Sequence, residues 1–279
     1  MSRNFSLLVS AVLASAGFCC AGATASANDG GISMGGSPGL LGSHPSVRMA
    51  SELIKISVRG NRVRADCRFV FVNSGPACRV RMGFPDRGEG ADDPDEESDP
   101  EKVMKTPPHT TFDSFASWVD GRPVGTRLIR ADLPGSYWHA KTVRFPGHSA
   151  VHIRDVYTQT LGGGIVSAGG GVGSAAQVAY VLHTGASWHG AIGRTEVAIE
   201  LPDPKPSRQL MLRSTAAASI SGNGRDLRGR LPSENTVIWK GPCTPTVSGS
   251  TIRFVRTNWR PVEADDIELT YGFKGIAPR

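Results

Sequence analysis

The sequence predicts an all-β protein with an antiparallel β-sandwich architecture, in two packed sandwich-like halves with long loops. Residues 63–71 alternate apolar and polar side chains with a period of two, which is typical of a strand with one face in a core. Further short apolar runs follow along the 279 residues, separated by Gly, Pro, Asn and Asp. No long segment has the 3.6-residue period of an amphipathic helix. Many short strands at such spacing favour a sandwich or a barrel.

The N-terminus has the three parts of a secretory signal peptide. Arg3 supplies a positive charge, residues 7–16 are apolar, and Ala25-Ser26-Ala27 places small residues at the cleavage positions. This order predicts a cleavable signal peptide over residues 1–27 and an exported protein, secreted or periplasmic. No later segment approaches the roughly 18 consecutive apolar residues of a membrane helix, so no transmembrane segment is expected after signal cleavage.

Composition predicts the division of the mature chain. Residues 28–47 are rich in Gly, Ser and Pro and have no periodicity, which predicts a flexible N-terminal segment. A Pro-Gly break at residues 134 and 135 is the candidate boundary between an N-terminal β domain, residues 48–134, and a C-terminal β domain, residues 135–279.

The first half predicts a meander of strands. The apolar run from Leu53 to Val58 and the alternating residues 63–71 flank a turn at Gly60-Asn61. A turn at residues 73–76 then leads to a third alternating run over 78–84. Asp120-Gly121 is a strong hairpin signal further on.

The second half continues in the same style. Residues 138–145 and 150–160 are expected to pair around Pro146-Gly147, and residues 162–176 to form a glycine-rich crossing loop. Six more short strands are expected over residues 177–184, 195–201, 208–212, 236–240, 250–258 and 266–273.

Three cysteines remain after signal cleavage, at positions 67, 78 and 243. With Ser74-Gly75 at a hairpin tip, residue 78 lies opposite residue 71, and residue 67 is four residues further along. That separation is about 13 Å, well beyond the limit of about 7 Å between the Cα atoms of a disulfide. Free cysteines are therefore expected.

The formal net charge of +6 conceals an acidic segment. Residues 86–101 carry nine carboxylates and one arginine, which predicts a solvated acidic loop. Two alternatives stay open: contact with a basic partner, or a calcium site made by Asp92, Asp93, Asp95, Glu96 and Asp99, although the segment lacks the spacing of an EF-hand loop. Nucleic acid is not expected as a partner, because the arginines are scattered and not clustered with aromatic residues.

Two glycine-rich strings resemble catalytic or cofactor motifs. Residues 35–39 fit the G-x-S-x-G string of serine hydrolases, but no strand and helix flank them. Residues 171–176 fit a loose dinucleotide fingerprint, but a strand-like run follows where a helix is needed. No cofactor is expected.

One turn offers candidate ligand-binding residues. His183 and His189 straddle residues 185–187 and could converge, and Trp188 lies in the same turn, where it is a candidate for exposure to a ligand or a sugar. No third metal ligand is evident nearby. The sequence therefore predicts a ligand site at Trp188, His189 and His183, without catalytic residues.

Several stretches resemble a known family. They include Val119-Asp120-Gly121-Arg122-Pro123-Val124, residues 180–193 (YVLHTGASWHGAIG) and Asn258-Trp259-Arg260-Pro261. In these residues the chain resembles the exported bacterial proteins known as domain of unknown function 4424, although Ala191 stands where that family tends to have proline. The resemblance implies an envelope or secreted β-protein and brings no activity or catalytic residues.

Two functions are consistent with these patterns. The first is a non-enzymatic binding or structural protein of the cell envelope, with an envelope protein or glycan as its partner. The second is a hydrolase acting on the envelope, or a carbohydrate-binding module, that uses the turn around Trp188 and His189. An enzyme would need a pocket that brings His183, His189 and a carboxylate within hydrogen-bond reach of each other.

Overall fold

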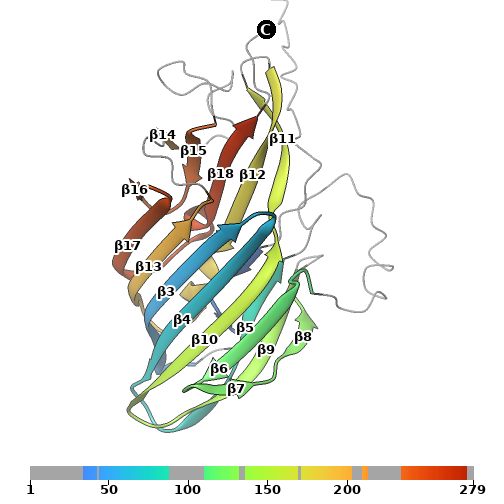
Figure 1. Ribbon diagram of the computed structural model, residues 1–279. Coiled ribbons are helices and arrows are strands. Elements are labelled where there is room, and N and C mark those ends of the chain that lie inside the picture. Colours follow the sequence, from blue (N-terminus) through green and yellow to red (C-terminus); the bar gives the residue numbers. More distant parts are fainter. Residues whose placement is uncertain are drawn as a thin grey trace, which may run out of the picture.

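The computed structural model describes residues 34–42, 44–87, 110–131, 136–168, 171–202, 209–212 and 234–274. These residues form two β-sheets that pack face to face (Figure 1). Apart from strands, the described residues form two short 3-10 turns, η1 (His183–Ser187) and η2 (Glu263–Asp265). The predicted all-β sandwich is confirmed.

The 8-stranded sheet, called sheet B, contains the longest strands. Its order is β16 (Thr246–Ser248), β17 (Thr251–Trp259), β13 (Ile192–Glu200), β3 (Val47–Arg59), β4 (Arg62–Asn73), β10 (Ser149–Thr160), β6 (Ser114–Val119) and β7 (Arg122–Val124).

The 10-stranded sheet, called sheet A, packs against it. Its order is β14 (Gln209–Leu212), β15 (Thr236–Lys240), β18 (Ile267–Lys274), β12 (Gly171–Val181), β1 (Met34–Gly36), β5 (Cys78–Arg87), β9 (Ser136–Phe145) and β8 (Arg127–Arg130). Two further strands pair outside this path, β11 (Gly162–Ala168) with β12 and β2 (Gly39–Leu40) with β5.

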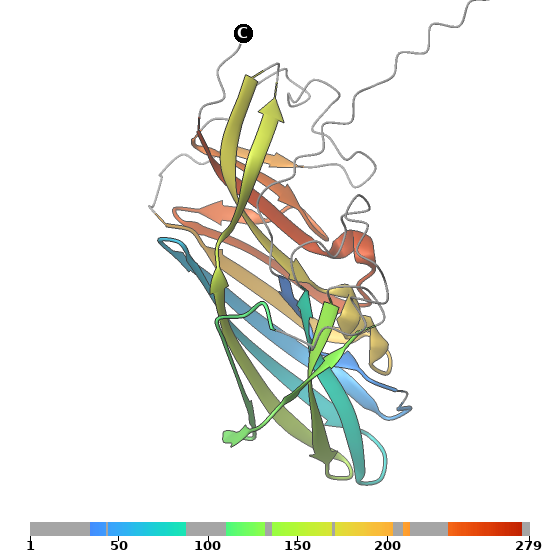
Figure 2. The same ribbon diagram turned by 90° about the vertical axis from the view of Figure 1, so that its right-hand side faces the viewer.

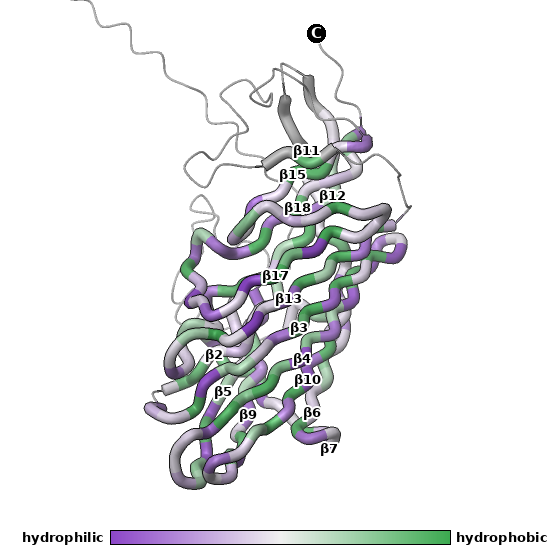
Figure 3. The backbone as a smooth tube through the Cα atoms, turned by 90° about the vertical axis from the view of Figure 1, so that its left-hand side faces the viewer, coloured by the Kyte–Doolittle hydropathy of each residue, from purple (hydrophilic) through white to green (hydrophobic). Residues whose placement is uncertain are grey.

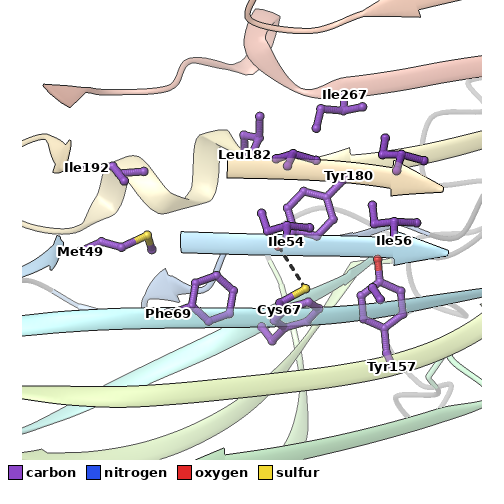
Figure 4. Close-up of a cluster of buried hydrophobic side chains, with 14 of the residues drawn as sticks. Met49, Ile54, Ile56, Cys67, Phe69, Tyr157, Tyr180, Leu182, Ile192 and Ile267 are labelled. Atoms are coloured by element: carbon purple, nitrogen blue, oxygen red, sulfur yellow. Dashed lines mark hydrogen bonds between the residues drawn. The ribbon is translucent and has the colours of Figure 1, made fainter. Parts of the chain in front are cut away.

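The core lies between the sheets and follows from the period of two. In β4 the residues at 63, 65, 67, 69 and 71 are buried, while their neighbours at 62, 64 and 68 are exposed. Inward residues of both sheets join one hydrophobic cluster. In its centre Tyr180 of sheet A donates a hydrogen bond to Cys67 of sheet B at 3.6 Å, with Ile54, Ile56 and Tyr157 close by (Figure 4).

The predicted division at residue 134 into two β domains is wrong, because each sheet combines strands from both halves. β13 runs parallel to β3, with Val197 opposite Ile54. β1 lies between β12 and β5, parallel to the first and antiparallel to the second. The sheets are therefore mixed, and one core serves both halves of the chain.

The predicted meander is also wrong at its second turn, because β4 and β5 belong to different sheets. Asn73, fully buried, holds this corner: its amide donates to the carbonyl groups of Pro76 at 2.8 Å and Pro146 at 3.0 Å, and its oxygen accepts from Gly75 N. The chain crosses between sheets at residues 146–148 as well, so β9 and β10 are not the hairpin expected there. Apolar alternation is the same for a hairpin and for a crossing, so it could not distinguish them.

The segment predicted to be flexible, residues 28–47, contributes β1 and β2 over its described part. A Cβ atom on Gly35 would lie 2.5 Å from the Tyr157 ring, and one on Gly36 would lie 2.6 Å from the carbonyl oxygen of Val181. Glycine is therefore required here because the strand is packed closely on both faces. The flexible assignment is wrong for residues 34–42 and 44–47; residues 28–33 lie outside the described part.

Two predicted hairpins are confirmed, and one loop is corrected. β3 pairs with β4 around Gly60 (φ +57°), and β6 pairs with β7 around Asp120 and Gly121 (φ +49° and +76°). The predicted crossing loop over residues 162–176 is instead the hairpin of β11 and β12, which extends past the end of the sandwich (Figures 1 and 2). The three cysteines are free, as expected.

Candidate functional site

The predicted ligand turn, residues 182–190, is anchored to two other parts of the chain. Asp266, just before β18, accepts hydrogen bonds through Oδ1 from the backbone N–H groups of Leu182 (2.7 Å) and His183 (3.0 Å). Its Oδ2 atom bonds to His183 Nδ1 at 2.7 Å. The hydrogen bond to Asp266 raises the pKa of His183 above its ordinary value, against the opposing effect of partial burial.

Trp188 is not at the surface, so its predicted exposure is wrong. Its side chain is 2% exposed and packs 4.4 Å from the ring of Phe71, measured between centroids. The indole Nε1 donates a 2.7 Å hydrogen bond to the carbonyl oxygen of Pro38. The indole therefore links the core to the N-terminal segment and is closed to a ligand.

The hydroxyl groups of the turn bind the same N-terminal segment. Thr184 Oγ1 donates to the carbonyl oxygen of Ser37, and Ser187 Oγ accepts from Leu40 N at 2.7 Å. Arg260 holds the turn from the other side through the carbonyl oxygen of Ala186, at 2.8 Å. The 182–190 turn thus joins β2, β12 and the β17–β18 connection, which gives its side chains structural roles.

The side chain of His189 is exposed. Its backbone N–H donates to the carbonyl oxygen of Val47 at 3.1 Å. The structure therefore brings His183 to a carboxylate, Asp266, but does not bring His189 or Trp188 to it. Within the described part of the chain, the His183 ring hydrogen-bonds to Asp266 through Nδ1.

The acidic segment begins inside the core. Asp86, at the end of β5, is fully buried and bonds to His139 Nε2 at 3.0 Å and to the Thr110 hydroxyl at 2.6 Å. Burial alone would raise the pKa of Asp86, but these bonds and those from Thr111 lower it. His139 stacks on Phe115 with ring centroids 4.1 Å apart. The expectation of a solvated loop is therefore wrong for residue 86.

The proposed calcium ligands Asp92, Asp93, Asp95, Glu96 and Asp99 lie outside the described residues. Where the structure does describe the chain, no three His, Cys, Asp or Glu side chains are grouped so that they could hold a metal ion. In the same residues, no helix is long and apolar enough to cross a membrane.

A cluster of arginines on the outer surface of sheet A is a better candidate site. Arg79 of β5 and Arg144 of β9 are direct cross-strand partners, and Arg81 is the next outward residue of β5. All three side chains are exposed. Like charges on directly opposite residues repel each other, and within the described residues no carboxylate lies within ion-pair distance of these arginines.

A shallow depression of about 410 Å³ lies at this cluster, lined by Ala77, Cys78, Arg79 and Arg144. The depression is open to solvent, so a ligand held there would remain partly exposed. Guanidinium groups are planar hydrogen-bond donors that bind carboxylates and phosphates through two parallel bonds. The depression is thus suited to a small anion, with the two arginines on adjacent strands as its main donors.

Sequence reasoning missed this site. Arg79 and Arg81 were visible as the solvent-facing residues of an alternating run, but Arg144 is 65 positions after Arg79 and comes beside it only through the pairing of β5 with β9. The sequence did show that Arg79, Arg81 and Arg144 lie on the polar faces of their strands, which indicates exposed positive charge but not that the three lie together.

Comparison with known proteins supports the fold. The crystal structure of a "putative nutrient binding protein" from Legionella pneumophila subsp. pneumophila str. Philadelphia 1 matches with a TM-score of 0.57 at 20% identity, over 87% of this chain and 72% of that chain. The M1 zinc metallopeptidase from Deinococcus radiodurans and yeast LTA4 hydrolase reach TM-scores of 0.33 and 0.39 at 10% identity, over 81% and 83% of this chain and 43% and 29% of theirs, too weak to carry an argument. No family model and no curated protein matches the sequence.

Proposed function

We propose that this chain is an exported, non-enzymatic binding protein of the bacterial cell envelope, secreted or periplasmic, and that it binds a small anion at Arg79, Arg81 and Arg144. The observation that carries the proposal is the direct opposition of Arg79 and Arg144 beside a depression of about 410 Å³. Two guanidinium groups held side by side repel each other, and a bound carboxylate or phosphate would remove that repulsion.

Export and family membership belong to the same proposal. The order of charge, apolar run and small residues over positions 1–27 supports export. The residues that carry the resemblance to domain of unknown function 4424 include the 182–190 turn, whose bonds join three parts of the fold. Such residues support a shared fold, and the name of the Legionella protein is in keeping with a binding role.

The alternative of an envelope hydrolase rests on one observation, the bond between His183 and Asp266. Both oxygens of that carboxylate also serve the turn, because Oδ1 accepts two backbone N–H groups and Oδ2 accepts the imidazole. A role in positioning the 182–190 turn accounts for this geometry without catalysis. The binding function is therefore preferred.

A thermal-shift screen tests the proposal. The purified protein would be heated with phosphate, succinate or citrate at constant ionic strength, with glucose as a neutral control and calcium and zinc as further ligands. A ligand that binds only the folded state raises the melting temperature with its concentration. We expect a dose-dependent rise with at least one anion, lost in the R79Q/R144Q double variant and kept in R194Q, which removes an arginine of the other sheet. A rise of equal size in R79Q/R144Q would contradict the proposed site.

A further inference from the structure

The outer surface of sheet B is strongly basic. Along its strands hydrophilic and hydrophobic residues alternate (Figure 3). The exposed positions of β3, β4 and β13 are mostly charged, and the buried ones between them are mostly apolar. The outward basic residues of β3, β4, β10, β13 and β17 are Arg48, Lys55, Arg59, Arg62, Arg64, Arg68, Arg154, Arg194 and Arg253, and the outward acidic residues are Asp66, Glu196 and Glu200. We call these residues the basic face. Basic side chains outnumber acidic ones threefold on it.

Two of the three carboxylates of the basic face, Asp66 and Glu196, are shared by several arginines. Glu200 pairs with Arg59, and Arg62 pairs with Asp113 beside the face. Asp66 accepts two bonds from Arg154, at 2.9 and 2.5 Å, and one from Arg68 at 3.3 Å, while Arg64 lies 3.8 Å away. One carboxylate balances one guanidinium, so positive charge remains in excess at this point. Arg64, Arg68 and Arg154 keep 50%, 57% and 41% of their side-chain surface exposed.

The same arrangement recurs on the other side of the face. Glu196 accepts bonds from Arg194 at 2.8 Å and from Arg253 at 2.8 Å. The bonds from Arg253 and Arg194 hold the pKa of Glu196 below its ordinary value. These carboxylates position the guanidinium groups, and the remaining N–H donors of the exposed arginines face solvent.

Five of the arginines, at positions 59, 62, 64, 68 and 154, are neighbours along or across the strands. Arg62, Arg64 and Arg68 lie on one face of β4, where every second residue recurs after about 7 Å. Across the strands, Arg59 is the partner of Arg62. In the same way Arg68 is the partner of Arg154. Adjacent strands lie about 4.8 Å apart, so the cations form a grid in two directions.

An aromatic side chain borders this grid. Trp118 of β6 is the cross-strand partner of Arg154, whose guanidinium carbon lies 5.3 Å from the indole centroid. Pro123 of β7 pairs with Trp118 on the other side. The edge of the basic face thus combines a cation with flat apolar surface.

We propose that the basic face binds an acidic polysaccharide, a linear polymer that carries carboxylate groups on its sugars. Eight of the nine basic residues are arginines, whose planar donors fit carboxylates in pairs. Cations that recur along and across the strands can pair with several carboxylates of one polymer chain, and the indole and Pro123 offer apolar surface to a sugar ring. This function is separate from the anion site on sheet A, because it uses the opposite outer surface of the sandwich.

A membrane surface fits the basic face less well. Surfaces that dock on bilayers bury large apolar side chains among the headgroups. Among the described residues, Val262 is the exposed large hydrophobic side chain. It lies between β17 and η2 and not on this face. Charge alone would therefore have to hold a membrane.

A binding titration with polygalacturonate tests the inference, with neutral dextran as the uncharged control. We expect the full chain to bind polygalacturonate and not dextran, with an affinity that falls as salt is added. The R59Q/R64Q/R68Q variant should bind about tenfold more weakly or worse and lose part of the salt dependence, because three contributors to the positive potential are gone. The R127Q variant, which removes an exposed arginine at the edge of sheet A, should bind normally and controls for the loss of positive charge elsewhere on the protein. Melting temperatures of all variants confirm that they fold.

Three results would overturn the inference. The first is equal affinity of wild type and R59Q/R64Q/R68Q for polygalacturonate. The second is tight binding to phosphatidylglycerol vesicles without binding to polygalacturonate, which would assign the face to a membrane. The third is binding of poly-glutamate as tight as that of polygalacturonate, which would assign it to acidic polypeptides.

Discussion

The hydroxyl group of Ser37 donates a 2.6 Å hydrogen bond to the carboxyl group of Glu52, and both side chains are buried. Thr195 donates a second bond to Glu52 at 2.7 Å and in turn accepts one from the indole of Trp259. Burial raises the pKa of Glu52 from 4.5 to about 7, and the two hydroxyl bonds only partly offset this effect. The N-terminal segment is thus tied to sheet B through a carboxyl group that titrates near neutral pH.

The first prediction concerns the pH dependence of stability. Between pH 4.5 and about 7 the folded protein binds a proton at Glu52 that the unfolded chain has released, so the free energy of unfolding falls as the pH rises through this window. The full effect is roughly 3 kcal/mol, at about 1.4 kcal/mol per pKa unit. Urea unfolding of wild type and E52Q at several pH values measures it. The difference between the two proteins should change by this amount, and parallel curves would contradict the assignment.

The second prediction concerns the ion pair that crosses the core. Lys141 of β9 donates to Asp155 of β10 at 2.5 Å and to Ser117 at 2.7 Å, and both charged side chains are buried. Replacing Lys141 by Met leaves the Asp155 charge without its partner and should lower the free energy of unfolding by about 3–5 kcal/mol. Urea unfolding measures the loss.

The matched control for this pair removes both charges. The K141M/D155L variant should be more stable than K141M alone, because no buried charge is left unpaired. A double variant less stable than K141M would show that Asp155 contributes through something other than this pair.

The third prediction concerns Trp188. Because the indole is buried against Phe71, the W188A variant should lose about 3–5 kcal/mol of stability. W188F keeps most of the packing but leaves the carbonyl oxygen of Pro38 without its donor, so a loss of about 1–3 kcal/mol is expected. Thermal or urea unfolding measures both. A negligible loss in W188A, with altered ligand binding, would favour the exposed role that the sequence suggested.

The fourth prediction concerns His183. Its hydrogen bond to Asp266 favours the charged imidazolium, so its pKa lies above the ordinary 6.5 in the folded protein. The stabilisation this provides is present at low pH and is lost as the pH rises through the raised pKa. An NMR titration of the His183 ring in wild type and D266N checks it. The pKa should fall in D266N, and no change would show that Asp266 does not set it.

Local sequence patterns predicted where most strands lie but not which strands pair with each other in the sheets. The alternation in β4 and at the start of β5 identified which residues enter the core, because that depends only on the period of two. The pairing of β13 with β3 and the insertion of β1 between β12 and β5 depend on contacts between distant segments. No local signal distinguishes a corner such as the one at Asn73 from a hairpin turn.

The candidate sites show the same limit. The turn around Trp188 looked exposed because Gly and Ser surround it, yet its donors find acceptors in Ser37 and Pro38, about 150 positions away in the sequence. The pairing of Arg79 with Arg144 could not be foreseen for the same reason. The sequence shows which residues of one strand are charged. It does not show which charged residues of two different strands lie opposite each other.

The measurement that tests the central claim most directly is a calorimetric titration of the protein with the anion that gives the largest thermal shift. Binding at Arg79 and Arg144 predicts a saturable heat with one site per chain in wild type and in R194Q, and none in R79Q/R144Q. The same heat and stoichiometry in R79Q/R144Q would contradict the account, because the anion would then bind somewhere other than the depression between β5 and β9.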